Sequence, residues 1–349
     1  MHTSGSSVEL ISVVIPTCNR KSALLALLDS LDRSVYPLLE VIIIDAGDDR
    51  LAPSDYDAFT NLNIQYRDSE RSVCIQRNLG IRLARSPWIF LCDDDVEMPS
   101  DYLQLLTEHI HTHQEAGAVC GLFLQKEGDQ WKGSYPLRSA RALAWKYIFR
   151  LGFWGEIEYQ GSNRLIQKIK KHYREKGNYI ASSGWPVLTD FSGDYFLSPI
   201  YTLGAALVKK DWLLYSPFDE ALDAHGIGDN YGVCIGFPGN GMHILTHAFV
   251  YHHQAPVNRL KRPLQYFRRM LALDYFMTAP PRNTHAKEKL RHTRRSRLLW
   301  SLTGNLLTFL LARDTGMVRA SFRCIRTIAL GRNPYSRAAM NKERVTEPQ

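Results

Sequence analysis

The chain has 349 residues, of which 45% are apolar and 22% are charged, and its net charge is +8. This composition excludes an intrinsically disordered chain and predicts a soluble protein whose core suits one domain plus an extension. The charge is uneven, because residues 258–344 hold 20 lysines and arginines against 4 aspartates and glutamates. We therefore expect a mildly acidic body joined to a strongly basic tail.

The cysteines and the chain ends bear on the cellular location. Six cysteines form no CxxC pair, so we expect free thiols in a reducing compartment. The first residues lack the basic and apolar segments of a signal peptide. The apolar stretch 298–312 is interrupted by polar residues and is shorter than the ~20 residues of a spanning helix. We expect a cytoplasmic protein, either free or peripheral on the inner face of the cell membrane.

Apolar runs typical of buried strands alternate with helical patterns through the first third of the chain. The predicted strands are 12–15, 41–44, 64–66, 88–92 and 118–124, and the predicted helices are 21–33, 72–85 and 99–113. This alternation predicts an α/β fold with a doubly wound, mostly parallel sheet. Ligands of such sheets bind at the carboxyl ends of the strands, where Asp45 and Asp93–Asp95 are expected.

The pattern weakens further along the chain. Residues 125–194 show no clear periodicity, whereas apolar runs return at 201–208 and 244–251. The basic tail has helical patterns at 263–276 and 294–328. We therefore expect a main domain of residues 1–255 and a basic helical extension of residues 256–349.

The segment FLCDDDVEMP places three adjacent carboxylates after a predicted buried strand. Such carboxylates repel one another unless a cation neutralises them. Alternate residues of an extended segment share a face, so we expect Asp93 and Asp95 to point together and Asp94 to point away. Oxygen ligands suit Mg²⁺ or Mn²⁺, which would hold a diphosphate. A solvated acidic turn is the alternative.

Residues 13–254 resemble a family 2 glycosyltransferase of the GT-A (nucleotide-diphospho-sugar transferase) fold. The motifs that carry the resemblance are, in order, VVIPTCNRKSALLALLDSL, EVIIIDAGDDR, RNLGIRLA, FLCDDDVEMP, TLGAALVKK and FDEALDAHGIGDN. The resemblance implies an inverting, metal-dependent glycosyltransferase of polysaccharide biosynthesis. Its donor would be a nucleotide-diphospho-sugar, and its acceptor a saccharide or a lipid-linked molecule.

The resemblance also implies roles for individual residues. The donor-binding residues would be Thr17, Arg20, Asp45, Arg77, Asp93 and Asp94. A divalent cation, Mn²⁺ or Mg²⁺, would be held by Asp93, Asp95 and His252, with His253 as the alternative histidine. The cation and Arg77 would offset the negative charge of the two phosphates. Alternatively, Arg77 pairs with a surface carboxylate.

The sequence departs from the family pattern at two positions. Ala46 follows Asp45 where the family usually has an acidic residue or asparagine, which leaves recognition of the nucleotide base to Asp45. The acceptor-side Glu-Asp pair is replaced by Asp229-Asn230. An amide cannot accept a proton, so Asp229 is the predicted general base, with Asp223 as a second candidate. A helix N-cap is the alternative role for Asp229.

The basic tail interleaves arginines with leucine, phenylalanine and tryptophan. This pattern is typical of amphipathic helices on an anionic membrane surface, and a helical cap with a solvated arginine face is the alternative. No nucleic-acid-binding module accompanies the charge, so we expect no nucleic-acid partner. A sugar nucleotidyltransferase, or a non-catalytic nucleotide-sugar-binding protein on the same fold, remains as the alternative function.

Overall fold

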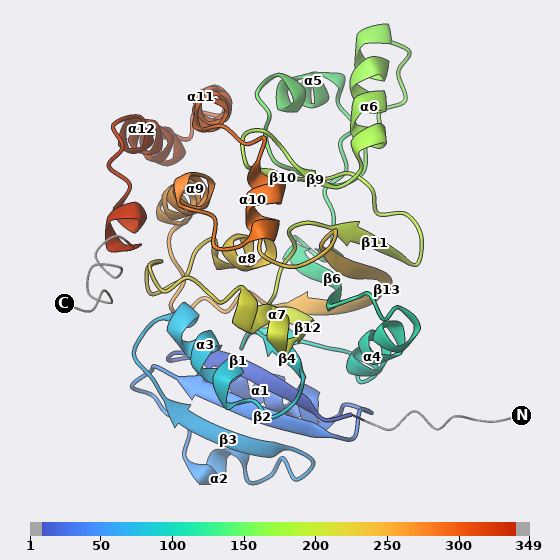
Figure 1. Cartoon of the computed structure of the whole chain (residues 1–349), viewed down its shortest axis with the longest axis vertical. Helices are drawn as coiled ribbons and strands as arrows, with labels where there is room; N and C mark the ends of the chain where they lie inside the picture. Colours follow the sequence, from blue (N-terminus) through green and yellow to red (C-terminus); the bar gives the residue numbers. More distant parts are fainter. Residues whose placement is uncertain (1–8, 340–349) are drawn as a thin grey trace, which may run out of the picture. The chain divides into compact units, whose positions relative to one another are not determined.

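The computed structural model describes residues 9–339, which form two compact units (Figure 1). The first unit contains residues 9–133, 202–218 and 242–258. The second unit contains residues 134–201, 219–241 and 259–339. Each unit is therefore assembled from segments that are far apart in the sequence. The expected division into a main domain of residues 1–255 and an extension of residues 256–349 stays a prediction.

A mixed sheet forms the centre of the first unit. Its strands are β1 (Ile11–Thr17), β2 (Leu39–Asp45), β3 (Asn63–Asp68), β4 (Trp88–Cys92), β5 (Val96–Glu97), β6 (Ala118–Glu127), β7 (Gln130–Lys132), β12 (Ala205–Lys209) and β13 (Met242–His252). The order is β13-β6-β12-β4-β1-β2-β3, with β5 beside β13 and β7 beside β6. Strands β4, β1, β2 and β3 run parallel, whereas β12 is antiparallel to β4 and β6. The predicted α/β fold with a mostly parallel central sheet is confirmed.

Strands β1 and β2 are buried along their whole length, which explains their unbroken apolar runs. A parallel sheet is covered on both faces, so neither face of these strands needs polar residues. The register pairs Thr17 with Asp45, the last residue of each strand. Because β4 also runs parallel to β1, the carboxyl ends of all three strands lie at one edge of the sheet.

The helices of the first unit are α1 (Lys21–Asp32), α2 (Pro53–Tyr56), α3 (Val73–Leu83), α4 (Tyr102–Thr112) and α7 (Lys210–Tyr215). Helix α3 packs on β1 and β2, and α4 packs on β6 and β13. Gly80 permits the close approach of α3, since a Cβ there would lie 2.4 Å from Cγ1 of Val14. The three helices predicted from the sequence are confirmed, with ends that differ by a few residues.

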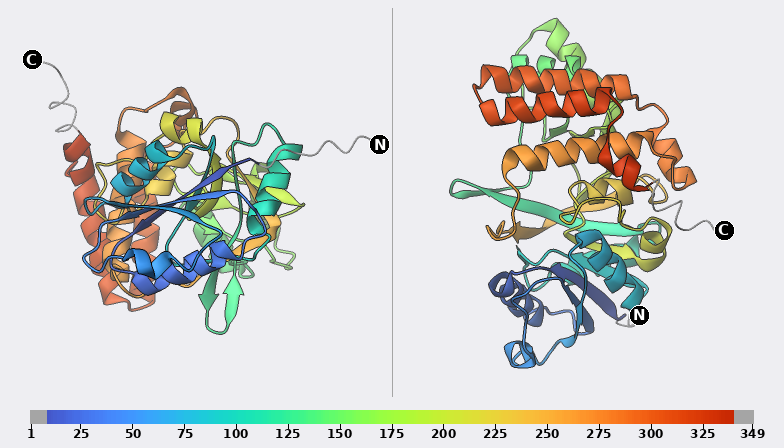
Figure 2. Two further views of the ribbon diagram at one scale, coloured as in Figure 1. Left: turned by 90° about the horizontal axis from the view of Figure 1, so that it is seen from below. Right: turned by 90° about the vertical axis from the view of Figure 1, so that its left-hand side faces the viewer.

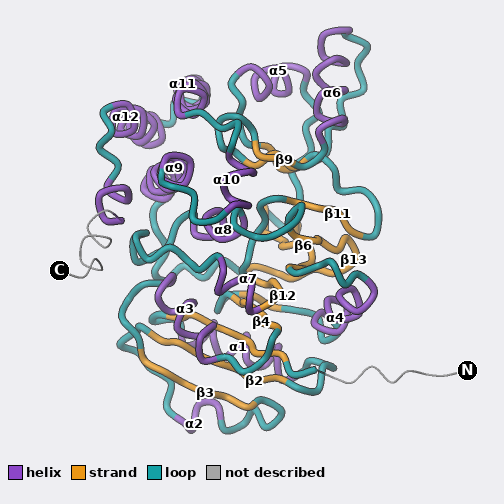
Figure 3. The backbone as a smooth tube through the Cα atoms, in the orientation of Figure 1, coloured by secondary structure: helices purple, strands orange, loops and turns teal. Residues whose placement is uncertain are grey.

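The second unit is mostly helix and loop (Figure 3). Its helices are α5 (Ala140–Ile148), α6 (Arg164–Lys176), α8 (Asp229–Cys234), α9 (Arg262–Thr278), α10 (Thr284–Leu290), α11 (Arg295–Leu311) and α12 (Thr315–Ala329). Its strands are β8 (Phe153–Trp154), β9 (Tyr179–Ile180), β10 (Pro186–Leu188) and β11 (Tyr195–Ser198). Strand β10 lies between β8 and β9 in a small sheet.

Residues 125–194, where the sequence shows no clear period, contain a small core of their own. Leu143 of α5 and Ile166, Ile169 and Tyr173 of α6 are buried together with Phe153 of β8. Only one side of each helix contributes to this core, and the other sides are polar or exposed. The short strands between the helices carry too few residues to show a period in the sequence.

The predicted basic helix 294–328 is in fact two helices, α11 and α12, which pack against each other and against α9 (Figure 2). The chain leaves the α-helical conformation at Arg313, where φ is +55°. Asp314 then caps α12, because its carboxylate accepts a hydrogen bond from the Met317 N–H at 3.0 Å. The apolar spacing continues through this break, so the periodicity alone did not reveal it.

One buried acid connects the basic helices of the second unit. Asp274 of α9 is fully buried, and its carboxylate accepts hydrogen bonds from Arg295 Nε at 2.8 Å and Nη2 at 3.1 Å. The side-chain amide of Asn333 donates to the same carboxylate at 2.9 Å. Part of the positive charge of the tail is therefore used internally, because a buried carboxylate requires such partners.

Two further expectations concern the cysteines and the membrane. All six cysteines lie within residues 9–339 and are free thiols, as expected. Across this described part of the chain, no helix is both long enough and apolar enough to span a bilayer.

Candidate active site

Three consecutive carboxylates follow β4, and the first two pair with side chains from β1, the loop after it, and α3. Asp93 Oδ1 lies 2.5 Å from Nη2 of Arg77. Asp94 accepts hydrogen bonds from Thr17 Oγ1 at 2.7 Å and from Arg20 Nη1 at 2.8 Å. The carboxyl ends of β1 and β4 are thereby connected through side chains.

The third carboxylate, Asp95, faces β13 and the segment that follows it. Its Oδ1 lies 3.2 Å from Nε2 of His252, the last residue of β13. Its Oδ2 accepts a hydrogen bond from the Ala255 N–H at 2.9 Å and lies 3.6 Å from Nη1 of Arg20. His253 instead pairs with Glu97 at 2.7 Å, so His252 is the histidine that adjoins the three carboxylates.

The expected alternation of the carboxylates, with Asp94 alone on the far face, does not hold. Asp94 and Asp95 both lie near Arg20, whereas Asp93 pairs with Arg77. The reason is that β4 ends at Cys92 and the chain turns at residues 94–95, so the geometry of an extended strand no longer applies.

The pKa values of Asp94 and Asp95 shift in opposite directions from the usual value of an aspartate. Burial raises the pKa of Asp94 to about 6, although Arg20 and Thr17 oppose the shift. Burial would also raise the pKa of Asp95, but the His252 hydrogen bond, the charge of Arg20 and the Ala255 N–H lower it to about 2. Asp95 is therefore an ionised carboxylate at neutral pH.

An ion pair and a contact with an aromatic ring hold the side chain of Arg77 on α3. It is buried, and its guanidinium lies 5.0 Å from the centroid of the Phe218 ring in addition to its ion pair with Asp93. The carboxylate that pairs with Arg77 is Asp93, the first residue of the acidic turn.

Asp45 ends β2 beside Thr17 in the register, and both of its oxygens accept hydrogen bonds within the protein. Oδ1 accepts from the Gly47 N–H at 2.7 Å, and Oδ2 accepts from the Tyr66 hydroxyl at 2.5 Å. Burial and the negative charge of Asp45 raise the pKa of Tyr66, so this hydroxyl stays protonated and donates. Asp45 therefore has a fixed orientation at the edge of the sheet.

Two supporting residues were not predicted from the sequence. The buried amide of Gln76 on α3 donates to the carbonyl oxygens of Thr17 and Ile44, each at 2.7 Å. Asn19, at φ +54°, accepts hydrogen bonds from the N–H groups of Asp48 and Asp49. A polar Gln76 on the sheet-facing side of α3 was the available signal, whereas Asn19 gave none beyond its turn-forming residue type.

Asp95 and His252 supply donor atoms that suit a divalent cation. Nδ1 of His252 is buried and has no hydrogen-bond partner among the described residues. Within residues 9–339, however, no group of three or more His, Cys, Asp or Glu side chains is arranged to hold a metal ion. Mg²⁺ and Mn²⁺ commonly take one or two protein ligands and complete their shell with phosphate oxygens and water. The residues present therefore fit a cation that binds together with a diphosphate.

Asp229 belongs to the second unit, where it is the first residue of α8. The preceding residue, Gly228, occupies the N-cap position with φ +101°. Asp229 is buried, and its Oδ1 accepts a hydrogen bond from the Asn230 N–H at 2.7 Å. Its charge lies near Arg269, where it counters the fall in the Arg269 pKa that burial causes. The alternative of Asp229 as the N-cap residue is wrong, because Gly228 holds that position.

Two polar residues near Asp229 in the sequence, Asp223 and Asn230, differ in their hydrogen bonds and ion pairs. Asp223 forms an ion pair with Arg268 at 2.6 Å and accepts a hydrogen bond from the Tyr335 hydroxyl at 2.5 Å. Both oxygens of its carboxylate therefore have partners within the protein. The side-chain oxygen of Asn230 is buried and has no hydrogen-bond partner in the described part of the chain. An unsatisfied buried acceptor of this kind suits a donor from a ligand.

Part of the chain is similar to known proteins. Residues 12–173 match the profile described as "Glycosyl transferase family 2". A "PGL/p-HBAD biosynthesis glycosyltransferase" of Mycobacterium bovis is 30% identical over 159 residues, which are 42% of this chain and 62% of that protein. The "Uncharacterized glycosyltransferase YwdF" of Bacillus subtilis is 30% identical over 133 residues, 36% of this chain and 48% of YwdF. The chain thus spans less than two thirds of the length of these relatives.

The fold also resembles a solved structure. The crystal structure of S. aureus TarS in complex with UDP-GlcNAc is similar with a TM-score of 0.50 at 12% sequence identity, and the match covers 92% of each chain. At this identity the likeness supports the fold alone.

The ion pair between Arg77 and Asp93 leads to a first prediction. Arg77→Met should lower the free energy of unfolding by about 1–3 kcal/mol, because a hydrogen bond to a charged group is lost. The same variant should gain more thermal stability from added MnCl₂ than the wild type does, since the three carboxylates then lack one of their cations. Arg82→Met, at an exposed position of α3, is the matched control. Equal stabilisation of all three proteins by Mn²⁺ would contradict the prediction.

Proposed function

We propose that this chain, whose residues 12–173 match the profile of glycosyl transferase family 2, is a glycosyltransferase that takes its sugar from a nucleotide-diphospho-sugar donor. The observation that carries the proposal is the cluster of three carboxylates at the end of β4, with Arg20, Arg77 and His252 around it. This cluster lies at the carboxyl edge of a parallel sheet, where such folds bind their ligands.

The donor would be bound by residues of the first unit. A divalent cation held by Asp95 and His252, with diphosphate oxygens completing its shell, would supply charge stabilisation to the departing nucleoside diphosphate. Arg77 and Arg20 would add positive charge beside the phosphates, and Thr17 keeps Asp94 in place through its hydrogen bond. Asp45 would orient the nucleotide base, with Tyr66 and Gly47 fixing its carboxylate.

The acceptor hydroxyl would be activated by Asp229 in an inverting reaction. Its carboxylate would take the hydroxyl proton as the hydroxyl oxygen attacks the anomeric carbon. The unsatisfied Asn230 oxygen would accept a hydrogen bond and orient the acceptor. Asp223, the second candidate, forms an ion pair with Arg268 and accepts a hydrogen bond from Tyr335.

A panel of nucleotide sugars, measured with and without Mn²⁺, tests the function directly. We expect transfer or slow donor hydrolysis with at least one donor, and its loss in Asp95→Ala because the cation and diphosphate then lose a ligand. Calorimetry should show that Mn²⁺-dependent binding of that donor's nucleoside diphosphate disappears in this variant. Glu97→Ala, two residues further on, is the control that should keep both properties. Activity that is independent of Mn²⁺ and of Asp95 would refute the metal-dependent mechanism.

Asp229→Asn separates chemistry from binding. The variant should keep its affinity for donor and metal while kcat falls by about 10²–10⁴-fold, since general base catalysis is typically worth that much. Asn230→Asp should restore part of the activity in the double variant if the two positions share the acceptor. Full transfer by Asp229→Asn would place the base elsewhere.

The helices α11 and α12 support a further part of the proposal, attachment to an anionic membrane surface. Phe322 of α12 is 62% exposed and is flanked by the exposed Arg319 and Arg323. Leu311, at the end of α11, is 80% exposed. Apolar side chains interleaved with cations suit the boundary between lipid head groups and acyl chains. A lipid-linked acceptor would be reached from such a surface.

Vesicle sedimentation tests this attachment. The protein should bind vesicles that contain anionic phospholipid and should be released at high salt, because salt screens exposed charges beyond ~3 Å at 1 M. Phe322→Ser should weaken binding, whereas Leu165→Ser, at an equally exposed apolar position on α6, should not. Equal binding to neutral and anionic vesicles, or no binding, would favour a helical cap with a solvated face.

A further inference from the structure

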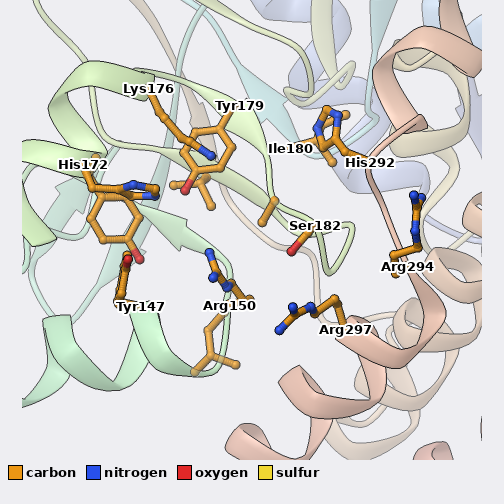
Figure 4. Close-up of a pocket in the computed structure, with 14 residues that line it drawn as sticks. Tyr147, Arg150, His172, Lys176, Tyr179, Ile180, Ser182, His292, Arg294 and Arg297 are labelled. Atoms are coloured by element: carbon orange, nitrogen blue, oxygen red, sulfur yellow. The ribbon is translucent and has the colours of Figure 1, made fainter.

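A basic cavity lies within the second unit, between α5, α6 and residues 292–297 (Figure 4). Its volume is about 480 Å³, within the usual range of small-molecule sites. Four permanent cations line it: Arg150, Lys176, Arg294 and Arg297. Among the described residues, no aspartate or glutamate is part of its wall. The cavity therefore concentrates positive charge from three separate segments of the chain.

These cations lack carboxylate partners. None of the four forms an ion pair with an acid within residues 9–339, which contrasts with the many paired arginines elsewhere in the protein. Arg150 lies 5.5 Å from the centroid of the Tyr147 ring, and Lys176 lies 5.0 Å from that of Tyr179. Burial and the charges of Lys176 and Arg150 lower the pKa of the nearby His172, as expected in a region of positive potential.

Arg150 is also held in a backbone conformation that normally belongs to glycine. Its φ is +54°, and it follows the end of α5. The Leu151 N–H donates to the Lys146 carbonyl at 3.0 Å, which is the hydrogen bond of a helix end that usually has glycine at the position of Arg150. A side chain in this conformation costs about 1–2 kcal/mol. Strain of this kind is typical of functional positions.

The tyrosines and the guanidinium groups without a carboxylate partner together define the ligand chemistry. Guanidinium groups bind phosphate oxygens through paired hydrogen bonds. In Figure 4, Arg150 and Arg297 extend into the space between α5, α6 and α11, and Tyr147 and Tyr179 stand beside it. The rings add walls for an organic group attached to the phosphate.

We propose that this cavity binds a phosphate or diphosphate group of a phosphorylated ligand. The site goes beyond the proposed function, because it is built only from residues of the second unit, whereas the donor residues belong to the first. Either proposal can fail without the other. The phosphate belongs either to a soluble molecule or to a lipid head group, and the experiment distinguishes these two sources.

Arg150→Gly is the central variant, since glycine suits the backbone conformation and the substitution removes the guanidinium together with the rest of the side chain. Calorimetric titration with inorganic pyrophosphate in EDTA should show binding by the wild type and at least ~10-fold weaker binding by Arg150→Gly. The thermal stability of the variant should be equal or higher, because the backbone strain is relieved. Arg174→Ala on α6, outside the cavity, should bind pyrophosphate like the wild type.

A second arm uses vesicles that contain phosphatidic acid. If Arg150→Gly and Arg297→Ala weaken pyrophosphate binding alone, the site takes a soluble phosphorylated ligand. If they weaken vesicle binding as well, it takes a lipid phosphate. Absent pyrophosphate binding by the wild type, or unchanged binding of both probes by the two variants, would overturn the proposal.

Discussion

The repulsion among Asp93, Asp94 and Asp95 is the constraint on which the ligand edge of the first unit depends. Three carboxylates at the end of a buried strand are stable only if opposite charges and hydrogen-bond donors reach them. These partners come from the loop after β1, from α3 and from the end of β13. The need to neutralise one short turn thus brings together elements that are almost 240 residues apart, and it lowers the pKa of Asp95.

Much of the first unit could be predicted from the sequence because its central strands are continuous apolar runs. The runs that became β1, β2 and β4 are buried over nearly their whole length, and such strands are recognisable without knowledge of their neighbours. The acidic turn could be placed at a carboxyl end for the same reason. His252 was singled out by resemblance, and it lies beside Asp95.

Other features could not be predicted, because they depend on contacts between distant residues or on a single backbone angle. The break between α11 and α12 rests on the left-handed conformation of Arg313 and the cap at Asp314, while the apolar spacing runs on unchanged. The directions of Asp93 and Asp94 follow from a turn, not from strand alternation. The cavity around Arg150 joins segments more than 140 residues apart, none of which has a recognisable motif.

Gln76 has a consequence for how sequence variation in relatives of this chain should be interpreted. Its amide uses two hydrogens to hold the carbonyl ends of β1 and β2 together. Glutamate has nearly the same shape, but its carboxylate would present oxygens to both carbonyls. Gln76→Glu would therefore replace two hydrogen bonds by repulsion between oxygens. Selection should therefore preserve glutamine at this position. If glutamine is invariant at this position in an alignment of relatives, the reason would be that it connects two strands, and not that it takes part in the reaction.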